Sequence, residues 1–379
     1  MITAAGLVFS NIHDRNVPEL TRKRTMASVP FGARYRLVDF TLSNMVNADI
    51  SKVGIITHYN YQSLMDHLGT GKDWDLARSS GGIKILPPFI TAYDNTTSSV
   101  QPYSSRLEAL MGAYNFISRC NEDYMVLSDC DIVCNIDLRD VIKFHVEKGA
   151  DITIVTKNLY LSTQSAKHCT IVESSEDGRV TNLIHNPNFS SGFMDMCLNI
   201  FVLKTEYLRS IVIDSLARGY KSFTHDIIYR GKDTMNFMKY EYDGYFSAIN
   251  SLDGYYKSNM DLLNPEVRNR IFGIKQRPVY TKVKNSPPAR YVGQGSVANS
   301  LIADGCIIEG RVENSILFRG VHVGKDTIIK NSILMQNTSV GDDVSLNCVI
   351  ADKNTVIHSG RTLSGHETHP FSLSKGTVI

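Results

Sequence analysis

The first residues that could do chemistry follow an apolar run at Tyr124–Ser128, where the sequence continues with Asp129, Cys130 and Asp131. The run is short and bounded by polar residues, which is typical of a β-strand. In an α/β domain with a mainly parallel sheet, ligands bind at the carboxyl ends of the strands. We therefore expect a ligand site in the loop after Ser128.

Two further groups of residues have spacings that a metal site could use, and both are better explained without a metal. Cys130 and Cys134 stand four residues apart, but no cluster of histidine or cysteine lies near them in the sequence to complete a zinc site. Buried small side chains are the expected reading. His366 and His369, in G-H-E-T-H near the C-terminus, are expected in a surface tail.

The elements that position these residues are predicted from alternating patterns over residues 1–263. Short β-branched runs such as Val53–Thr57 and Ile152–Thr156 alternate with segments of helical spacing such as Leu107–Ser118. This alternation predicts an α/β domain with a mainly parallel sheet and helices on both faces.

The pattern changes twice after that domain. Residues 264–290 contain four prolines and several basic residues, and we expect a connector with little regular structure there. Within residues 291–379, apolar residues recur in steps of six, as at Leu317, Val323, Ile329 and Met335. Steps of six predict a parallel β-helix of roughly four coils with about eighteen residues each. The terminal coils of such a helix expose edges that another domain or subunit must cover.

The stretch Val29–Ile50 reads V-P-F-G-A-R-Y-R-L-V-D-F-T-L-S-N-M-V-N-A-D-I, which fits a loop that feeds a helix. It resembles the V-P-x-G-G-K-Y-R-L-I-D-F-x-L-S-N signature of the glucose-1-phosphate adenylyltransferase (ADP-glucose pyrophosphorylase) family. The resemblance covers nearly the whole chain. It implies a nucleotidyltransferase-type, mainly parallel sheet with helices on both faces, followed by a C-terminal left-handed parallel β-helix.

The resemblance also implies where catalytic groups should stand. Adenylyl transfer from ATP to a sugar phosphate needs a glycine-rich loop for the triphosphate, basic residues and carboxylates that hold a divalent cation, usually Mg²⁺. Here the aligned positions hold other residues, so no competent catalytic residue is expected. They are, in sequence order, Asn11, Ile12, Asp14 and Asn16 in the loop, Met26 and Asn186 in place of lysines, and Ala248 in place of a metal carboxylate.

The other metal carboxylate of the family aligns with Asp131. A shift of the alignment by one residue would place Cys130 there instead, and the nearby Asp129 complicates the choice. Trp74, in G-K-D-W-D, and Asp226, in H-D-I-I, stand as in the family and are candidate pocket residues, although each could equally belong to the framework.

A basic set is better preserved. The family binds an anionic effector between its two domains, and the matching positions here are Arg24, Arg36 and Lys353, while a further family arginine falls on Asp66. Three cations can hold a phosphate or sulfate. Solvated side chains that pair with local acids are an equally good explanation.

The bulk composition excludes several classes of partner. With 40 basic and 38 acidic residues the net charge is +2, which gives no electrostatic case for nucleic acid or a membrane as partner. The apolar patch Ala4–Phe9 is predicted to be a first strand and not a signal peptide or membrane span. Seven cysteines without a C-x-x-C pair indicate reduced thiols in the cytoplasm.

These observations favour a non-catalytic or feebly active subunit of glycogen biosynthesis that raises the activity of a catalytic paralogue, in a heterotetramer as the family implies. No cofactor is certain in that role, and Mg²⁺ and ATP would bind only if activity is retained. Two alternatives stay open. One is a competent adenylyltransferase in which Asp129 and Asp131 share the metal, and the other is a sugar-nucleotide-binding sensor without a partner.

Overall fold

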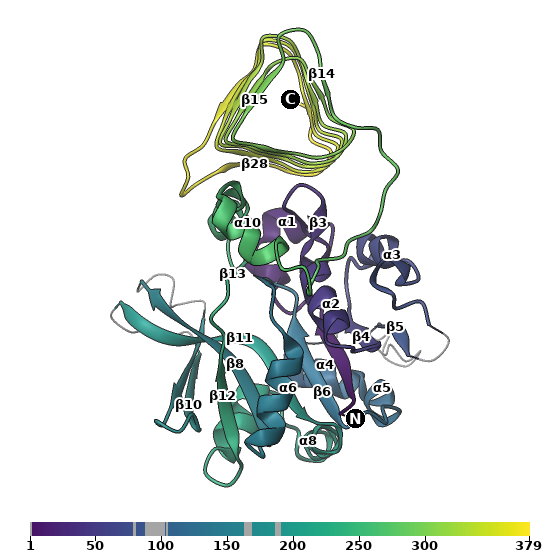
Figure 1. Cartoon of the computed structure of the whole chain (residues 1–379), viewed down its shortest axis with the longest axis vertical. Helices are drawn as coiled ribbons and strands as arrows, with labels where there is room; N and C mark the ends of the chain where they lie inside the picture. The colour runs from purple at the N-terminus through teal and green to yellow at the C-terminus, as the bar shows by residue number, and fades with distance from the viewer. Residues whose placement is uncertain (1, 79–80, 88–102, 104, 163–168, 186–190) are drawn as a thin grey trace, which may run out of the picture.

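The computed structural model describes residues 2–78, 81–87, 103, 105–162, 169–185 and 191–379 of the chain. It consists of an α/β domain and a triangular β-helix that is stacked on one end of it (Figure 1). The α/β domain therefore presents one end of its sheet to the β-helix and leaves the rest of its surface free of it.

The central sheet is mixed. Among the described residues it has nine strands in the order β10-β9-β11-β6-β1-β4-β5, with β8 beside β11 and β12 beside β8. Strands β6, β1, β4 and β5 run parallel to one another, whereas β11 runs antiparallel to both β6 and β8. The prediction of parallel strands is confirmed for this half of the sheet. The bounds are β1 (Ala4–Phe9), β4 (Lys52–Ile56), β5 (Gly82–Leu86), β6 (Tyr124–Asp129), β8 (Ile152–Leu161), β9 (Thr170–Ser174), β10 (Val180–His185), β11 (Gly192–Lys204) and β12 (Phe237–Glu241).

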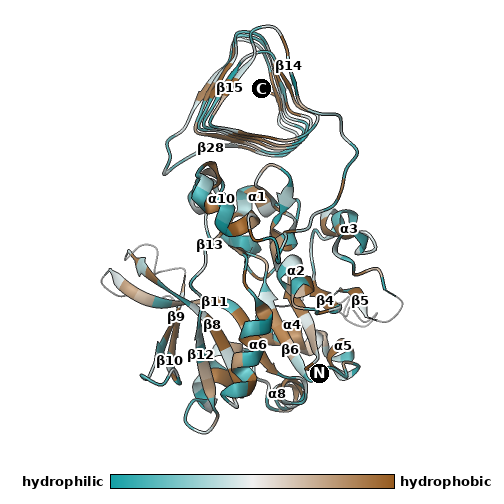
Figure 2. Cartoon of the chain, viewed as in Figure 1, coloured by the Kyte–Doolittle hydropathy of each residue, from teal (hydrophilic) through white to brown (hydrophobic). Residues whose placement is uncertain are grey.

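Helices cover both faces of the sheet because alternate residues of its strands are apolar on each side. In β1, Leu7 and Phe9 belong to one core cluster and Val8 belongs to the other. Helices α4, α5 and α8 pack on the first face, and α2, α3 and α6 pack on the second. Figure 2 shows the hydrophobic residues concentrated in the strands between these layers. The bounds are α2 (Leu37–Asn47), α3 (Gln62–Leu68), α4 (Arg106–Gly112), α5 (Tyr114–Ser118), α6 (Leu138–Glu147) and α8 (Thr205–Arg218).

The signature stretch forms a tight hairpin that feeds a helix, which confirms the prediction from its pattern. Strands β2 (Pro30–Phe31) and β3 (Tyr35–Arg36) pair antiparallel, and the turn between them uses left-handed backbone at Gly32 (φ +56°). The N–H of Arg36 donates to the carboxylate of Asp39 at 2.9 Å, which caps the first turn of α2. This hairpin lies at the end of the domain that faces the β-helix.

The β-helix consists of three parallel sheets, each of five strands within the described range 191–379. It begins at β14 (Arg290–Tyr291) and its last strand is β28 (Phe371–Leu373). Register partners such as His322 and Ser339 are seventeen residues apart, one fewer than the predicted eighteen. Near the start of the β-helix the spacing is shorter still, since Ile307 pairs with His322, and corners such as Asn314 (φ 44°) use one left-handed residue. The remaining strands are β15 (Ser296–Ala298), β16 (Leu301–Ile302), β17 (Ile307–Ile308), β18 (Arg311–Glu313), β19 (Ile316–Leu317), β20 (His322–Val323), β21 (Ile328–Lys330), β22 (Ile333–Leu334), β23 (Ser339–Val340), β24 (Ser345–Asn347), β25 (Val349–Ala351), β26 (Val356–Ile357) and β27 (Thr362–Ser364).

The predicted connector contains a helix, α10 (Pro265–Phe272), so the expectation of little regular structure in 264–290 is wrong for its first part. The side chain of Asn264 accepts the N–H of Glu266, and Pro265 stands at the first helical position, where its fixed φ favours a helix. The rest of the connector, up to Arg290, has no regular element among these residues, which are all described.

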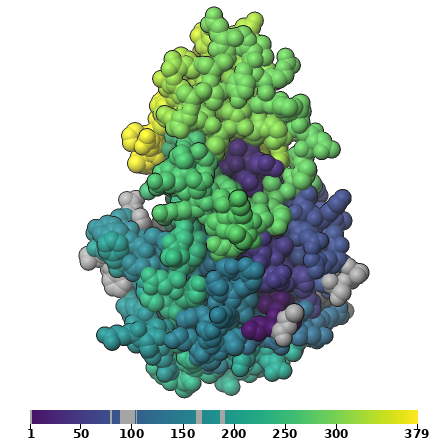
Figure 3. Space-filling model, viewed as in Figure 1, coloured from purple at the N-terminus to yellow at the C-terminus, as the bar shows by residue number. Residues whose placement is uncertain are grey.

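The two domains share a hydrophobic core. It joins Phe31 and Tyr255 of the α/β domain to Phe318, Met335 and Ile350 of the β-helix. Met335 therefore faces the α/β domain. The steps of six predicted Met335 inside the β-helix, but Leu334 occupies that interior position. Figure 3 shows the β-helix in continuous contact with α10 and with purple N-terminal residues beneath it. The elements of this region are α1 (Pro18–Thr21), α9 (Leu252–Met260) and α10.

Among the described residues, no helix has both the length and the apolar character needed to cross a lipid bilayer.

Candidate functional site

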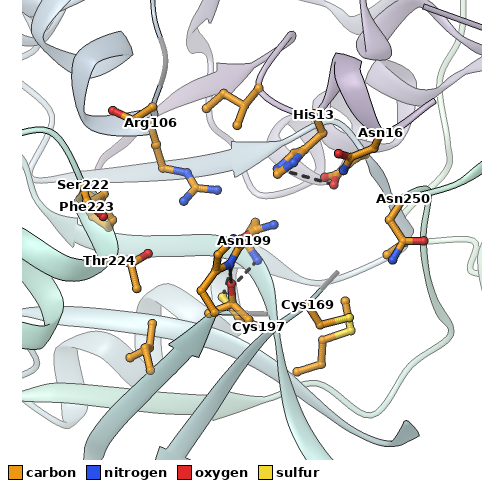
Figure 4. Close-up of a pocket in the computed structure, with 18 of the residues that line it drawn as sticks. His13, Asn16, Arg106, Cys169, Cys197, Asn199, Ser222, Phe223, Thr224 and Asn250 are labelled. Atoms are coloured by element: carbon orange, nitrogen blue, oxygen red, sulfur yellow. Dashed lines mark hydrogen bonds and ion pairs between the residues drawn. The ribbon is translucent and has the colours of Figure 1, made fainter. Parts of the chain in front are cut away.

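The carboxyl ends of β1 and β6 lie side by side, because Phe9 pairs with Asp129 in the parallel register. A cavity of about 760 Å³ opens at this edge (Figure 4). The loop after Ser128 contributes Asp131 and Ile132 to its lining. The other described lining residues come from the loop after β1, the start of α4, the strands β9, β10 and β11, the π-helix η4 (Phe223–Tyr229), the end of β13 (Phe246–Ala248) and the segment after it.

Four charged side chains form a cluster on the wall of this cavity. The buried carboxylate of Asp129 accepts Nε2 of His13 at 2.7 Å and Nη2 of Arg106 at 2.5 Å. His13 Nε2 also lies 3.6 Å from Asp131 Oδ2. The guanidinium of Arg106 is held between the rings of Phe9 and Phe201. A buried carboxylate needs such partners, because an unpaired charge in the interior is costly.

The pKa values in the cluster reflect this pairing. Burial alone would raise the pKa of Asp129, but Arg106 and His13 hold it below its ordinary value. Burial opposes the charge on His13, yet the carboxylates of Asp131 and Asp129 raise its pKa to about 9. Burial and the neighbouring Asp129 raise the pKa of Asp131, against the influence of His13. The cluster is thus an internally balanced set of two cations and two acids.

The polar side chains of the loop after β1 form hydrogen bonds with other parts of the protein. The side-chain amide of Asn11 donates to Asp14 Oδ2 at 2.7 Å and its oxygen accepts Thr57 Oγ1 at 2.9 Å. Asp14 Oδ1 accepts the backbone N–H of Met26 at 2.7 Å. Burial raises the pKa of Asp14 to about 7, although these hydrogen bonds oppose the shift. An acid therefore occupies the loop where the family resemblance implies a cradle for phosphate.

The other replaced positions are divided between the cavity and the core. Ile12 and Asn16 line the cavity, whereas Met26 is 1% exposed and packs in the core between the domains. Asn186 lies outside the described residues. Met26, which aligns with one of the two family lysines, therefore does not point its side chain into the cavity.

The metal positions can be placed through a small antiparallel sheet. In it, β7 (Ile132–Cys134) pairs with β13 (Phe246–Ala248), and Ala248 lies opposite Ile132. Asp131 and Ala248 both line the cavity, while Cys130 is 1% exposed in the core beneath it. A methyl group thus stands where the family has its second carboxylate. The residues present do not fit a magnesium site built from those two carboxylates.

Trp74 and Asp226, the candidate pocket residues, are not among the described residues that line the cavity. Trp74 is 1% exposed and its ring packs edge-on against His67 in the core. Asp226 accepts the backbone N–H groups of Lys221 and Ser222, each at 3.0 Å, and these bonds help to lower its pKa to about 2. In the described structure these contacts of the two residues are with the protein's own core and backbone, and Asp226 shapes the segment of η4 that lines the cavity.

Two residues of the cluster were not singled out from the sequence, namely His13 and Arg106. The available signal was position: His13 follows the end of the first predicted strand by four residues, and Arg106 begins the helix Arg106–Gly112. Both places lie at the carboxyl edge of a parallel sheet, where ligand sites form. The topology that brings them to Asp129 and Asp131 could not be read from the sequence.

The basic set predicted between the domains lies close together, but its members differ in their partners. Both oxygens of Asp352 accept Nη2 of buried Arg24 at 2.8 Å. Nη1 of Arg36 donates to the backbone oxygen of Ser63 at 2.5 Å. Burial, together with the charges of Arg36 and Arg24, lowers the pKa of Lys353 to about 6. The charge of Arg24 is therefore neutralised by an acid, whereas Arg36 and Lys353 have no carboxylate bonded to them in the described structure.

Comparison with known proteins gives matches over both domains. A family model for nucleotidyl transferase matches residues 16–264, and one for a GlmU-like C-terminal hexapeptide domain matches residues 287–371. The chain is 38% identical over 374 residues to glycogen biosynthesis protein GlgD of Bacillus subtilis, covering 98% of this chain and 96% of that one. It is 34% identical to GlgD of Geobacillus stearothermophilus, covering 98% and 96% of the two chains. It is 29% identical to the glucose-1-phosphate adenylyltransferase of Mycoplasma mobile, covering 86% and 84%.

Proposed function

The chain belongs to the nucleotidyl transferase family, in the group of the GlgD proteins and glucose-1-phosphate adenylyltransferases, and from this premise we propose its function. It acts in glycogen biosynthesis as a non-catalytic or feebly active subunit of ADP-glucose pyrophosphorylase. A catalytic paralogue carries out the reaction of ATP with glucose 1-phosphate to ADP-glucose and diphosphate, and this chain enhances it. Its seven free, buried cysteines support the cytoplasm as its place of action.

The observation that carries this proposal is a cavity of about 760 Å³, large enough for a ligand, that lacks the groups that adenylyl transfer needs. Ala248 brings no oxygen beside Asp131, and Asp14 places an acid in the phosphate loop. Among the described lining residues, Arg106 is the one arginine or lysine, and it is bonded to Asp129. Charge that develops on a triphosphate would find little stabilisation here, and the loss of one such group often costs about 10²–10³ in rate.

The intact scaffold supports assembly with a partner. One continuous hydrophobic core joins the two domains. Such a core holds the domains in a fixed arrangement, which a subunit needs if it is to support its partner. Within the part of the chain that the structure describes, the first β-helix strands, β14, β15 and β16, pair with a strand on one side only. Such edges are usually covered. We therefore propose a mixed oligomer with the catalytic paralogue, a heterotetramer by analogy with the family.

Three assays test the proposal: this chain alone, the catalytic paralogue alone, and the two mixed after co-purification. We expect no measurable ADP-glucose from this chain alone and a higher rate from the mixture than from the paralogue. Light scattering on the mixture should show one stable oligomer. Turnover by this chain alone at ordinary enzyme rates would instead establish a competent adenylyltransferase, and the absence of a mixed oligomer would favour a sensor.

We further propose that a phosphate or sulfate binds between the domains beside Arg36 and Lys353. The proposal is supported by Arg36, by the amine of Lys353, and by Lys284, whose pKa is lowered by burial and by nearby Arg319 and Arg36. Like charges gathered in a partly buried place favour an anion. Arg24 contributes charge at longer range, since Asp352 already accepts its guanidinium.

The pKa of Lys353 makes this anion binding dependent on pH. In the free protein the amine becomes neutral above a pKa of about 6, because burial and the charges of Arg36, Arg24 and Lys284 disfavour its protonation, while Asp352 favours it. A bound anion favours the protonated amine, so binding takes up a proton above that pKa. We expect the affinity for sulfate, which stays fully ionised, to be at least about tenfold higher at pH 6.5 than at pH 8.5.

Calorimetric titration with sulfate at several pH values measures this effect. The matched variant Lys353→Met should bind more weakly at pH 6.5 and should lose most of the pH dependence. His67 also senses the charge of Lys353, and His67→Gln serves as the control that keeps the pH dependence. An equally steep pH profile in Lys353→Met would contradict the assignment.

A further inference from the structure

The charged cluster at the carboxyl ends of β1 and β6 has a donor set unlike that of the magnesium site which the family implies. His13, Asp129 and Asp131 each offer one ligand atom, and these atoms all lie within 4.8 Å of one another. We propose that they bind a divalent transition-metal ion of the zinc, cobalt and manganese class. This site goes beyond the proposed function and does not depend on it.

The separations of the donor atoms suit one ion. A zinc ion binds imidazole nitrogen and carboxylate oxygen at about 2.0–2.2 Å, so two donors on the same tetrahedral ion lie about 3.4 Å apart. His13 Nε2 lies 2.7 Å from Asp129 Oδ2 and 3.6 Å from Asp131 Oδ2. All three donor atoms lie within 4.8 Å of one another, so side-chain adjustments would bring them to one ion between them.

Two carboxylate oxygens of the cluster also lack a donor. Oδ1 of Asp129 and Oδ1 of Asp131 are buried and accept no hydrogen bond in the described part of the chain. The two residues are 0% and 5% exposed. Buried carboxylate oxygens without a partner carry a desolvation cost that a bound cation removes. This observation is independent of the spacing and points to the same ligand.

The chemistry of the donors selects the class of ion. Magnesium prefers oxygen ligands and near-ideal octahedral geometry, whereas imidazole nitrogen favours zinc and its first-row neighbours. The third donor at this site is therefore the imidazole of His13, whereas Ala248, which also lines the cavity, offers no ligand atom. Figure 4 shows His13 and Arg106 pointing toward the same space.

The surroundings leave room for a further ligand. Nη2 of Arg106 donates to Asp129 Oδ2 at 2.5 Å, and an outer partner of this kind orients a metal-ligating carboxylate. The cluster faces the cavity of about 760 Å³, so water or an anionic group can complete the coordination. With neutral His13, the two carboxylates balance the ion, and Arg106 leaves one positive charge in excess. The loaded site would therefore attract a phosphate-bearing ligand to a cavity that is otherwise balanced.

Titration of the untagged, chelator-treated full-length chain with Co²⁺ tests the site, because bound cobalt has visible absorption bands that report its ligands. We expect one equivalent to bind, to be displaced by Zn²⁺, and to resist Mg²⁺ at a hundredfold higher concentration. His13→Ala should raise the dissociation constant at least tenfold, and Asp131→Asn should do the same. His366→Ala, at the exposed C-terminal histidine pair, should leave it unchanged within twofold.

Circular dichroism of each variant shows whether it is folded, and His13→Gln replaces His13→Ala if the latter is not. Binding of Co²⁺ that is unaffected by both His13 variants would overturn the proposal. So would equal affinity for Mg²⁺, and so would the absence of any bound ion, in which case the imidazolium of His13 is itself the counter-ion of the two carboxylates.

Discussion

Replacing Asp352 with alanine is expected to lower the free energy of unfolding by about 3–5 kcal/mol, because it leaves a buried arginine without its partner. Arg24 is 2% exposed and both its bonds to a carboxylate, at 2.8 Å, go to Asp352. The pair joins the α/β domain to the β-helix, so the variant loses both a charge partner and an interdomain tie. Urea unfolding followed by circular dichroism measures the change.

A double variant separates the unpaired charge from the lost packing. Arg24→Met combined with Asp352→Leu should recover at least half of the stability, since an apolar pair of similar volume often replaces a buried ion pair without loss. Glu147→Ala is the surface control, because its pair with Lys143 is 62–72% exposed and such pairs contribute at most about 1 kcal/mol. A loss below 1 kcal/mol for Asp352→Ala would show that Arg24 reaches water.

The same tie adjoins the proposed anion site, since Lys353 follows Asp352 directly. The amide N–H of Lys353 donates to Asp352 Oδ1 at 2.6 Å, so the carboxylate that holds Arg24 also fixes the backbone of the lysine. An anion bound at Lys353 therefore acts on the contact between the domains. In a mixed oligomer, this gives a route by which such an anion could change the activity of a partner.

Periodicity predicted the architecture but not its details. Alternating runs gave the α/β domain, and steps of six gave the β-helix, because buried faces impose those periods on the sequence. The antiparallel direction of β11 could not be predicted, since the apolar pattern of a buried strand is the same whether the strand runs parallel or antiparallel to its neighbour. Met335 lies in the interdomain core because the side of the coil before it is five residues long and not six. The left-handed corner at Asn331 accompanies this shorter side, and such a corner leaves only a weak signal in the sequence.

For the site, the family resemblance identified positions, whereas the contacts came from the fold. It placed Ala248 and Asp131 at one site, and β7 and β13 do bring them to the same cavity. It gave no indication that His13 would lie 2.7 Å from Asp129, because that contact depends on how the loop after β1 folds over the end of β6. Side chains at replaced positions make new contacts, and these depend on tertiary geometry that an alignment does not contain.

Restoring the missing carboxylate alone is expected to leave this chain at least about 10⁴-fold slower than a catalytic paralogue. In Ala248→Asp a second acid would stand beside Asp131, since position 248 lies opposite Ile132 on the cavity wall. The phosphate loop would still hold Asn11 and Asp14 in bonds to the protein, and Met26 would still be buried in the core. Each missing electrostatic group costs about 10²–10³ in rate, so two or more remaining losses exceed 10⁴.

The experiment measures ADP-glucose formation by this chain alone. Ala248→Asn is the matched control, because asparagine has the shape of aspartate without its charge. Both variants should stay inactive, because the groups that contact the triphosphate are integrated into the fold. Met26→Lys, for example, would place a charge in the core between the domains, where Met26 is 1% exposed, and burying a charge there is costly. If Ala248→Asp brought turnover to within a hundredfold of the paralogue while Ala248→Asn did not, the chain would be an enzyme that lacks one ligand, and the loop replacements would be neutral.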